Sequence, residues 1–112
     1  MLIQNFEVIK GETFVNDVFI RVNNKVCPLP NFTAYSEIRP YVGSKVLTDS
    51  FACEIFPDKG LIRMTLTKEQ TNNLPVGIQH YDLLLINNET QETVYYISGR
   101  LVIKKHITEL PT

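Results

Sequence analysis

The feature that most constrains the fold is a period of two in the apolar residues, which is clearest in the last third of the chain. Residues 78–86 and 93–103 alternate apolar and polar side chains, and the polar segment 87–92 separates them. Because successive side chains of a strand point to opposite faces, this alternation is typical of half-buried strands. The two segments therefore predict a long β-hairpin with one apolar face.

The rest of the chain follows the same period in shorter segments. Strands are expected at residues 13–22, 33–39, 46–48, 51–56 and 62–66, with Pro28 and Pro30 confining the segment between them to an edge or a connection. Thr67 and Gln70 have the spacing of a helix capping box, but Pro75 and Gly77 limit that helix to about two turns. The pattern predicts an all-β, two-layer antiparallel sandwich of about six to eight strands with one short helical turn.

Alternation also predicts which side chains face the core. The expected inward set is Val18, Ile20, Ala34, Ile38, Ile62, Met64, Leu66, Tyr81, Leu83, Leu85, Ile97, Leu101 and Ile103. The same parity places Tyr95 inward, with Gly99 as a bulge or a close-packing point. The opposite parity turns four apolar residues outward, and these are the candidate interface residues: Leu84, Ile86, Tyr96 and Val102.

Length and charge restrict the classes of protein that the sequence can encode. A chain of 112 residues has the size of a single domain, 1–112. Its 11 basic and 12 acidic residues are scattered, so no basic surface for nucleic acid is expected. Lys104, Lys105 and His106 are interpreted as a solvated strand end. The sequence shows neither an export signal nor an apolar run of about 18 residues, so no membrane association is expected.

The residues that usually carry catalysis or bind metals are few. Cys27, Cys53, His80 and His106 lack the short paired spacings of zinc sites, so neither metal nor cofactor is expected. Both thiols are expected to be free, as in a reducing compartment. His80 and Asp82 share one strand face, but such a pair is more often surface polarity than a catalytic unit. The sequence therefore favours a protein that is not an enzyme.

Six segments together resemble a known family. They are KGETF at 10–14, FTAYSEIR at 32–39, GLIRMTLT at 60–67, TNNLPVG at 71–77, YDL at 81–83 and GRLVI at 99–103. In this order and spacing they resemble the small immunoglobulin-like domain of tailed-phage virion proteins, such as the N-terminal domain of baseplate upper proteins. Where that family tends to have polar residues after its Tyr-Asp-Leu motif, this chain has Leu84 and Ile86. A solvated outer face is therefore not expected, and the face would be covered either by a partner or by a loop or the N-terminal segment of the same chain.

The resemblance implies a non-enzymatic virion structural protein, an adaptor or attachment component of the tail, baseplate, neck or fibre. It implies assembly in the bacterial host cytoplasm and partners that are other virion proteins, in a homo-oligomeric or symmetric arrangement. Baseplate upper proteins continue beyond this domain, so a stand-alone adaptor is expected for a chain that stops at Thr112. The alternative is a carbohydrate- or receptor-binding sandwich in which an exposed ring such as Tyr41 stacks on sugar, although the chain has no tryptophan.

Overall fold

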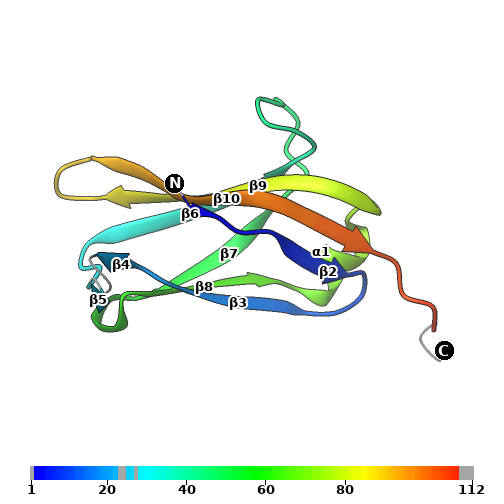
Figure 1. Ribbon diagram of the computed structural model, residues 1–112, viewed down its shortest axis with the longest axis horizontal. Coiled ribbons are helices and arrows are strands. Elements are labelled where there is room, and N and C mark those ends of the chain that lie inside the picture. The colour runs from blue at the N-terminus through cyan, green and yellow to red at the C-terminus, as the bar shows by residue number, and fades with distance from the viewer. Residues whose placement is uncertain (1, 23–24, 27, 109–112) are drawn as a thin grey trace.

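The computed structural model describes residues 2–22, 25–26 and 28–108 and shows two β-layers that enclose one apolar core (Figure 1). The strands in these ranges are β1 (Leu2–Ile3), β2 (Phe6–Ile9), β3 (Phe14–Phe19), β4 (Arg21–Val22), β5 (Lys25–Val26), β6 (Phe32–Arg39), β7 (Asp49–Phe56), β8 (Leu61–Leu66), β9 (Gly77–Asn87) and β10 (Thr93–Lys104). A 3-10 turn, η1 (Pro57–Lys59), and one helix, α1 (Lys68–Asn73), complete the elements. The all-β sandwich predicted from the alternation is confirmed.

One eight-stranded sheet makes both layers because it folds over at β7. Its order is β1-β10-β9-β6-β7-β8-β3, with β2 also paired to β10, while β4 and β5 form a separate two-stranded sheet. The first residues of β7 pair with β6, as in Phe51 opposite Ser36, and the later ones pair with β8, as in Cys53 opposite Met64. The strand β7 therefore carries the chain from one layer to the other (Figure 1).

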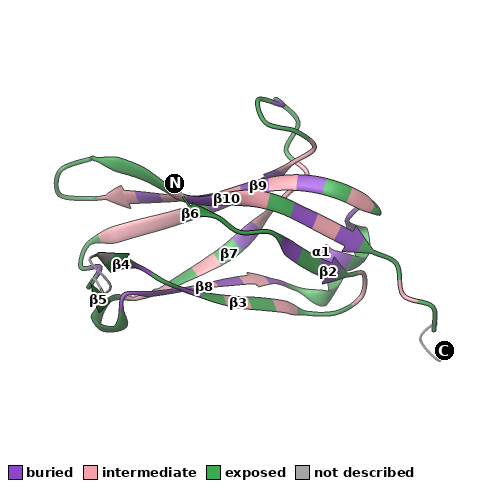
Figure 2. Ribbon diagram, in the orientation of Figure 1, coloured by how far each residue is buried: buried purple, intermediate pink, exposed green. Residues whose placement is uncertain are grey.

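The predicted hairpin is the longest element of the fold. β9 and β10 pair antiparallel from Ile86–Thr93 to Gly77–Ile103, and buried residues alternate with more exposed ones along both strands (Figure 2). The register shifts between Tyr95 and Ile97, so Tyr96 is the extra residue of a β-bulge. Gly99, which was expected to be either a bulge or a close-packing point, keeps the regular register opposite Tyr81. Because the bulge reverses parity, Tyr95 lies on the outer face opposite Leu84, and its predicted inward position is wrong.

Gly99 is the close-packing point that the sequence indicated. The N-terminal residues run parallel to β10, with Ile3 beside Ser98 and Phe6 beside Leu101. Between these pairs the carbonyl oxygen of Gln4 lies 2.0 Å from the position that a Cβ on Gly99 would occupy. Only glycine lets the two backbones approach this closely. No strand had been predicted for residues 2–9.

The structure confirms the expected inward set, although one of its residues is less deeply buried than the others. Twelve of those residues are buried, and Ala34 is partly buried against the same cluster. The cluster also contains apolar residues that the prediction omitted, among them Phe6, Val8, Leu29, Phe51 and Leu74. Phe6 stacks on Tyr81 with ring centroids 4.8 Å apart, and Phe51 meets the same ring edge-on at 5.8 Å. The Phe6 ring also lies 5.3 Å from the ring of Phe14 on β3, so aromatic contacts join the N-terminal strand β2 to both layers.

Two of the predicted strands differ from the structure. Residues 13–22 form β3 and β4 rather than one strand. The N–H of Ile20 still donates to the carbonyl of Gly60, in register with the β3–β8 pair, and Arg21 then pairs with Val26 on β5 instead of with β8. Residues 46–48 belong to a loop, in which the N–H of Val46 donates to the hydroxyl of Ser44. The loop projects from the sandwich between β6 and β7 (Figure 1).

The short helix forms where the capping-box spacing predicts it. The Thr67 hydroxyl accepts from the Gln70 N–H at 3.1 Å, and the Gln70 side chain accepts from the Thr67 N–H at 2.8 Å. These two bonds form the capping box, and α1 ends at Asn73 before Pro75. Within the part of the chain that is described, no helix is long and apolar enough to cross a membrane.

Candidate functional site

The structure divides the four predicted interface residues between three environments. Leu84 and Ile86 lie half-buried on the outer face of β9, and Val102 lies half-buried on the same face of β10. Tyr96 instead packs against the core, and its hydroxyl accepts a hydrogen bond from the N–H of Arg21 at 3.3 Å. The β-bulge at Tyr96 is the physical reason for this correction, because the extra residue turns inward.

Val102 is separated from Leu84 along the strands by polar residues. The pairs Asp82–Ser98 and His80–Arg100 lie between them, and Val102 instead neighbours Ile78 on β9 and Glu7 on β2. The four residues therefore do not form one continuous apolar patch. A different apolar row crosses the outer face at Leu84, whose neighbours are Tyr35 on β6 and Tyr95 on β10.

This row is part of a groove that we call the tyrosine groove. Its volume is about 360 Å³, and it is lined by Tyr35, Glu37, Arg39, Tyr41, Val42, Gly43, His80, Asp82, Leu84 and Tyr95. The strands β6, β9 and β10 contribute the floor, and the projecting loop contributes Tyr41, Val42 and Gly43. A groove that combines aromatic rings with a few charged groups has the usual composition of a binding site.

The loop side of the groove is held by hydrogen bonds rather than by a sheet. The Arg39 guanidinium donates to the carbonyl of Ser44 at 3.1 Å, and the N–H of Ser44 donates to the carbonyl of Tyr41. Ser44 is buried, whereas Val42 is 85% exposed. These bonds hold the apolar loop residues in solvent, next to the tyrosines of the sheet.

Charge within the groove is unevenly compensated. Glu37 forms an ion pair with Arg39 at 2.9 Å, whereas the Asp82 carboxylate forms no hydrogen bond with any residue that the structure describes. Burial raises the pKa of Asp82, and repulsion from Glu37 raises it further, while Arg39 partly opposes the shift. His80 also lines the groove, but no hydrogen bond joins it to Asp82 in the described ranges.

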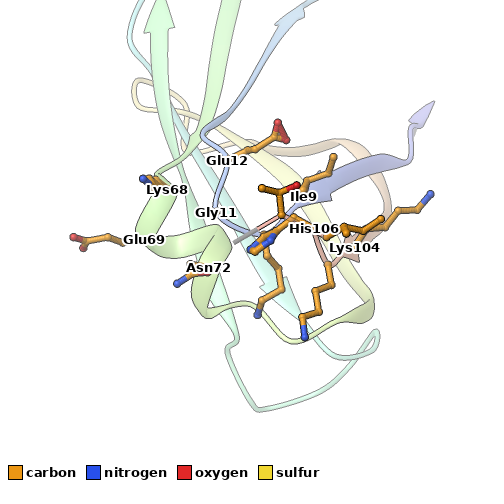
Figure 3. Close-up of a pocket in the computed structure, with 12 residues that line it drawn as sticks. Ile9, Gly11, Glu12, Lys68, Glu69, Asn72, Lys104 and His106 are labelled. Carbon is orange, nitrogen blue, oxygen red and sulfur yellow. The ribbon is translucent and has the colours of Figure 1, made fainter. Parts of the chain in front are cut away.

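A larger hollow of about 930 Å³ lies at the end of the sandwich that holds α1 (Figure 3). The predicted strand end Lys104–His106 lines it together with Gly11, Glu12 and the start of α1. The His106 ring packs over Gly11, while the side chains of Lys68 and Glu69 extend away from it (Figure 3). Among the described residues, His106 supplies the one aromatic ring in the lining of this hollow, so the hollow offers fewer ring faces to a ligand than the tyrosine groove.

Other candidate chemistry is limited in residues 2–22, 25–26 and 28–108. No group of three or more His, Cys, Asp or Glu side chains there is placed to hold a metal ion. Cys53 is a free, half-buried thiol, and burial raises its pKa to about 11, which makes it a poor nucleophile. Cys27 lies outside the described residues.

Sequence reasoning missed the tyrosine groove because it considered each strand alone. Tyr35, Glu37 and Arg39 have the outward parity of β6, which could be read from the sequence. Their position beside Asp82 and Leu84 depends on the pairing of β6 with β9, two strands far apart in the sequence, as in Arg39 opposite His80 and Tyr35 opposite Leu84. No local signal predicts that pairing.

Comparisons with known proteins give the fold and no family. No family model matches the chain, and no curated protein matches it in sequence. Among solved structures, the N-terminal domain of phage TP901-1 ORF48 aligns with a TM-score of 0.59 at 7% identity, over 91% of this chain and 86% of that one. The NK cell receptor Nkp44 aligns with a TM-score of 0.51 at 13% identity, over 90% of this chain and 97% of that one. At these identities the likeness shows a shared sandwich fold alone.

Proposed function

We propose that the chain is a non-enzymatic structural component of a tailed-phage particle. The observation that carries the proposal is the likeness to the N-terminal domain of a phage protein over 91% of this chain. The resemblance of six sequence segments to phage virion domains agrees with this assignment, while no family model matches the chain. The likeness to Nkp44 shows that the fold is also used by receptors, so the phage role depends on these two observations together.

The role within the particle is that of an adaptor or attachment component of the tail, baseplate, neck or fibre. Its partners are other virion proteins, in a homo-oligomeric or symmetric assembly, and neither nucleic acid nor membrane is among them. The outer face of β6, β9 and β10 is the proposed contact surface, because Tyr35 and Tyr95 are 55% and 51% exposed on either side of Leu84. Exposed aromatic residues of this kind are enriched in protein interfaces.

Quantitative mass spectrometry of purified particles of the encoding phage tests the structural role. We expect the chain in the particles at a constant ratio to the other tail proteins. Particles assembled without the chain, in a phage from which its gene is deleted, should lack a neighbouring component. Intact, infectious particles that never contain the chain would contradict the proposal.

The contact surface is tested with the double variant Leu84→Lys and Ile86→Lys. Both side chains lie on the outer face of β9, so the variant should fold, while two added charges should prevent a contact there. Val15→Lys is a matched control, since Val15 is exposed on β3 in the other layer. If the folded double variant enters particles as well as the control does, the partner is held elsewhere.

The alternative function, carbohydrate or receptor binding, remains a prediction. The structure favours it in one respect, because Tyr41 shares the tyrosine groove with Tyr35 and Tyr95. Sugar binding needs such rings together with hydrogen-bonding groups, and the groove contains both. The experiment described below includes saccharide probes and separates the two functions.

A further inference from the structure

The tyrosine groove places aromatic rings around a space large enough for one long side chain. Leu84 forms its floor between Tyr35 and Tyr95, which are its direct neighbours on β6 and β10. Tyr41 approaches from the loop, so three tyrosines and one leucine line a volume of about 360 Å³. Rings in this arrangement attract a cation through the negative charge of their faces.

The next row of residues on the same strands supplies negative charge. Glu37 lies opposite Asp82 in the register that pairs Tyr35 with Leu84 and Arg39 with His80. The groove thus contains two carboxylates and one guanidinium, Arg39, which is bonded to Glu37. The carboxylate of Asp82 remains half-buried without a hydrogen bond among the described residues. A cationic occupant would neutralise it.

Apolar and saccharide ligands are less complementary to the groove. An apolar segment would cover Asp82 and leave its carboxylate buried without a hydrogen bond from any described residue, which is unfavourable. Sugar hydroxyl groups can donate to a carboxylate, but they do not neutralise its charge. A lysine or arginine side chain places an apolar stem against the rings and its charge at the carboxylate.

We propose that the tyrosine groove binds a lysine or arginine side chain presented by a neighbouring protein. The stem of that side chain lies along Tyr35, Leu84 and Tyr95, and its cationic end meets Asp82. The inference deepens the proposed function by stating the chemistry of the partner. It rests on that function, because the proposed structural role is the reason to expect that the partner is a protein. Its test uses the purified chain without particles, so a failure here is distinct from a failure of particle incorporation.

The experiment is a titration of the purified full chain followed by ¹H–¹⁵N NMR spectra. The probes are Nα-acetyl-lysine amide, Nα-acetyl-arginine amide and the uncharged Nα-acetyl-norleucine amide. We expect saturable shifts at the amides of Tyr35, Asp82, Leu84 and Tyr95, with Kd on the order of millimolar for the better cationic probe. Norleucine amide should bind at least about tenfold more weakly, because it lacks the charge.

Two variants of the groove and one control make the test specific. Asp82→Asn should lower the affinity for the cationic probe about tenfold and leave the affinity for norleucine amide unchanged. Tyr35→Leu should lower the affinity for the cationic probe severalfold, because it removes an aromatic ring and no charge. This variant keeps the test valid if Asp82→Asn fails to fold. Glu54→Gln removes an exposed carboxylate from β7 opposite Arg63, in the other layer, and should change nothing.

Three results would overturn the proposal. Equal binding of norleucine amide and the cationic probes would make the groove a purely apolar site. Binding of methyl glycosides of glucose, galactose or N-acetylglucosamine at the same amides, without binding of the cationic probes, would make it a saccharide site. If the folded Asp82→Asn variant binds the cationic probes with unchanged affinity, the carboxylate of Asp82 takes no part in binding.

Discussion

The hydroxyl of Tyr81 donates a 2.6 Å hydrogen bond to the carbonyl oxygen of Gln4, which precedes it by 77 residues. Tyr81 lies opposite Gly99 in the β9–β10 ladder, and Gly99 is the residue that the Gln4 carbonyl approaches. The missing side chain of Gly99 lets the N-terminal segment come close to β10, within reach of the Tyr81 hydroxyl. Gln4 is therefore bonded to two neighbouring strands, through its carbonyl to Tyr81 on β9 and through its N–H to the carbonyl of Ser98 on β10.

Tyr81→Phe should lower the free energy of unfolding by about 1–2 kcal/mol, because a part-buried carbonyl loses its donor while the ring remains against Phe6. Urea unfolding followed by circular dichroism measures the change. Tyr35→Phe is the matched control, since Tyr35 is exposed, and it should change the stability by less than about 0.5 kcal/mol. Equal effects of the two variants would show that the hydrogen bond to Gln4 contributes nothing.

Gly99→Ala should destabilise the protein by more than about 2 kcal/mol, because the added Cβ would meet backbone atoms of Gln4 that cannot move alone. Hydrogen exchange at the amides of residues 4–9 should accelerate as the N-terminal segment separates from β10. Gly43→Ala is the control, since its positive φ costs about 1 kcal/mol while open space surrounds the added methyl group. A stable Gly99→Ala variant with normal exchange would contradict the close approach.

Leu83→Ala should cost about 2–5 kcal/mol, since Leu83 is completely buried in the core. Leu84→Ala, one residue further along β9, should cost about 1 kcal/mol or less, because its side chain is on the outer face. Denaturant unfolding of the two variants gives the comparison. A cost below about 1 kcal/mol for Leu83→Ala would show that the facing of β9 is wrong.

Stability should fall at alkaline pH because of Cys53. Burial raises its pKa from 9.0 to about 11, so between these values the unfolded state loses a proton that the native state keeps. The contribution is intact below pH 9.0 and is lost as the pH rises toward about 11, with a loss of about 1 kcal/mol by pH 10.

The measurement is the free energy of unfolding at pH 8 and pH 10 under reducing conditions, for the wild-type chain and for Cys53→Val. The variant should lose about 1 kcal/mol less than the wild type over this interval, because all other titrating groups are common to both. Parallel pH profiles would indicate that the thiol is as accessible in the native state as in the unfolded one.

Some residues of the binding surface are positioned by the local strand pattern, and others are positioned by the pairing of distant strands. Leu84 and Ile86 were placed outward by alternation along a regular part of β9, where parity holds. Tyr96 was misplaced because an extra residue in one strand reverses the parity, and the bulge is defined by the register with β9 rather than by its own sequence. The same shift brought Tyr95 to the outer face and so into the tyrosine groove.

By itself the sequence determined the sandwich class, the facing of most core residues and the short capped helix. These features depend on the pleat of a single strand or on hydrogen bonds within one helical turn, and both leave a pattern in consecutive residues. Only the tertiary structure decided the parallel docking of β1 and β2 on β10, the crossing of β7 between layers and the assembly of the groove from Tyr35, Asp82 and Tyr95. Each of these depends on which strands become neighbours, and that choice is made by the packing of the whole core.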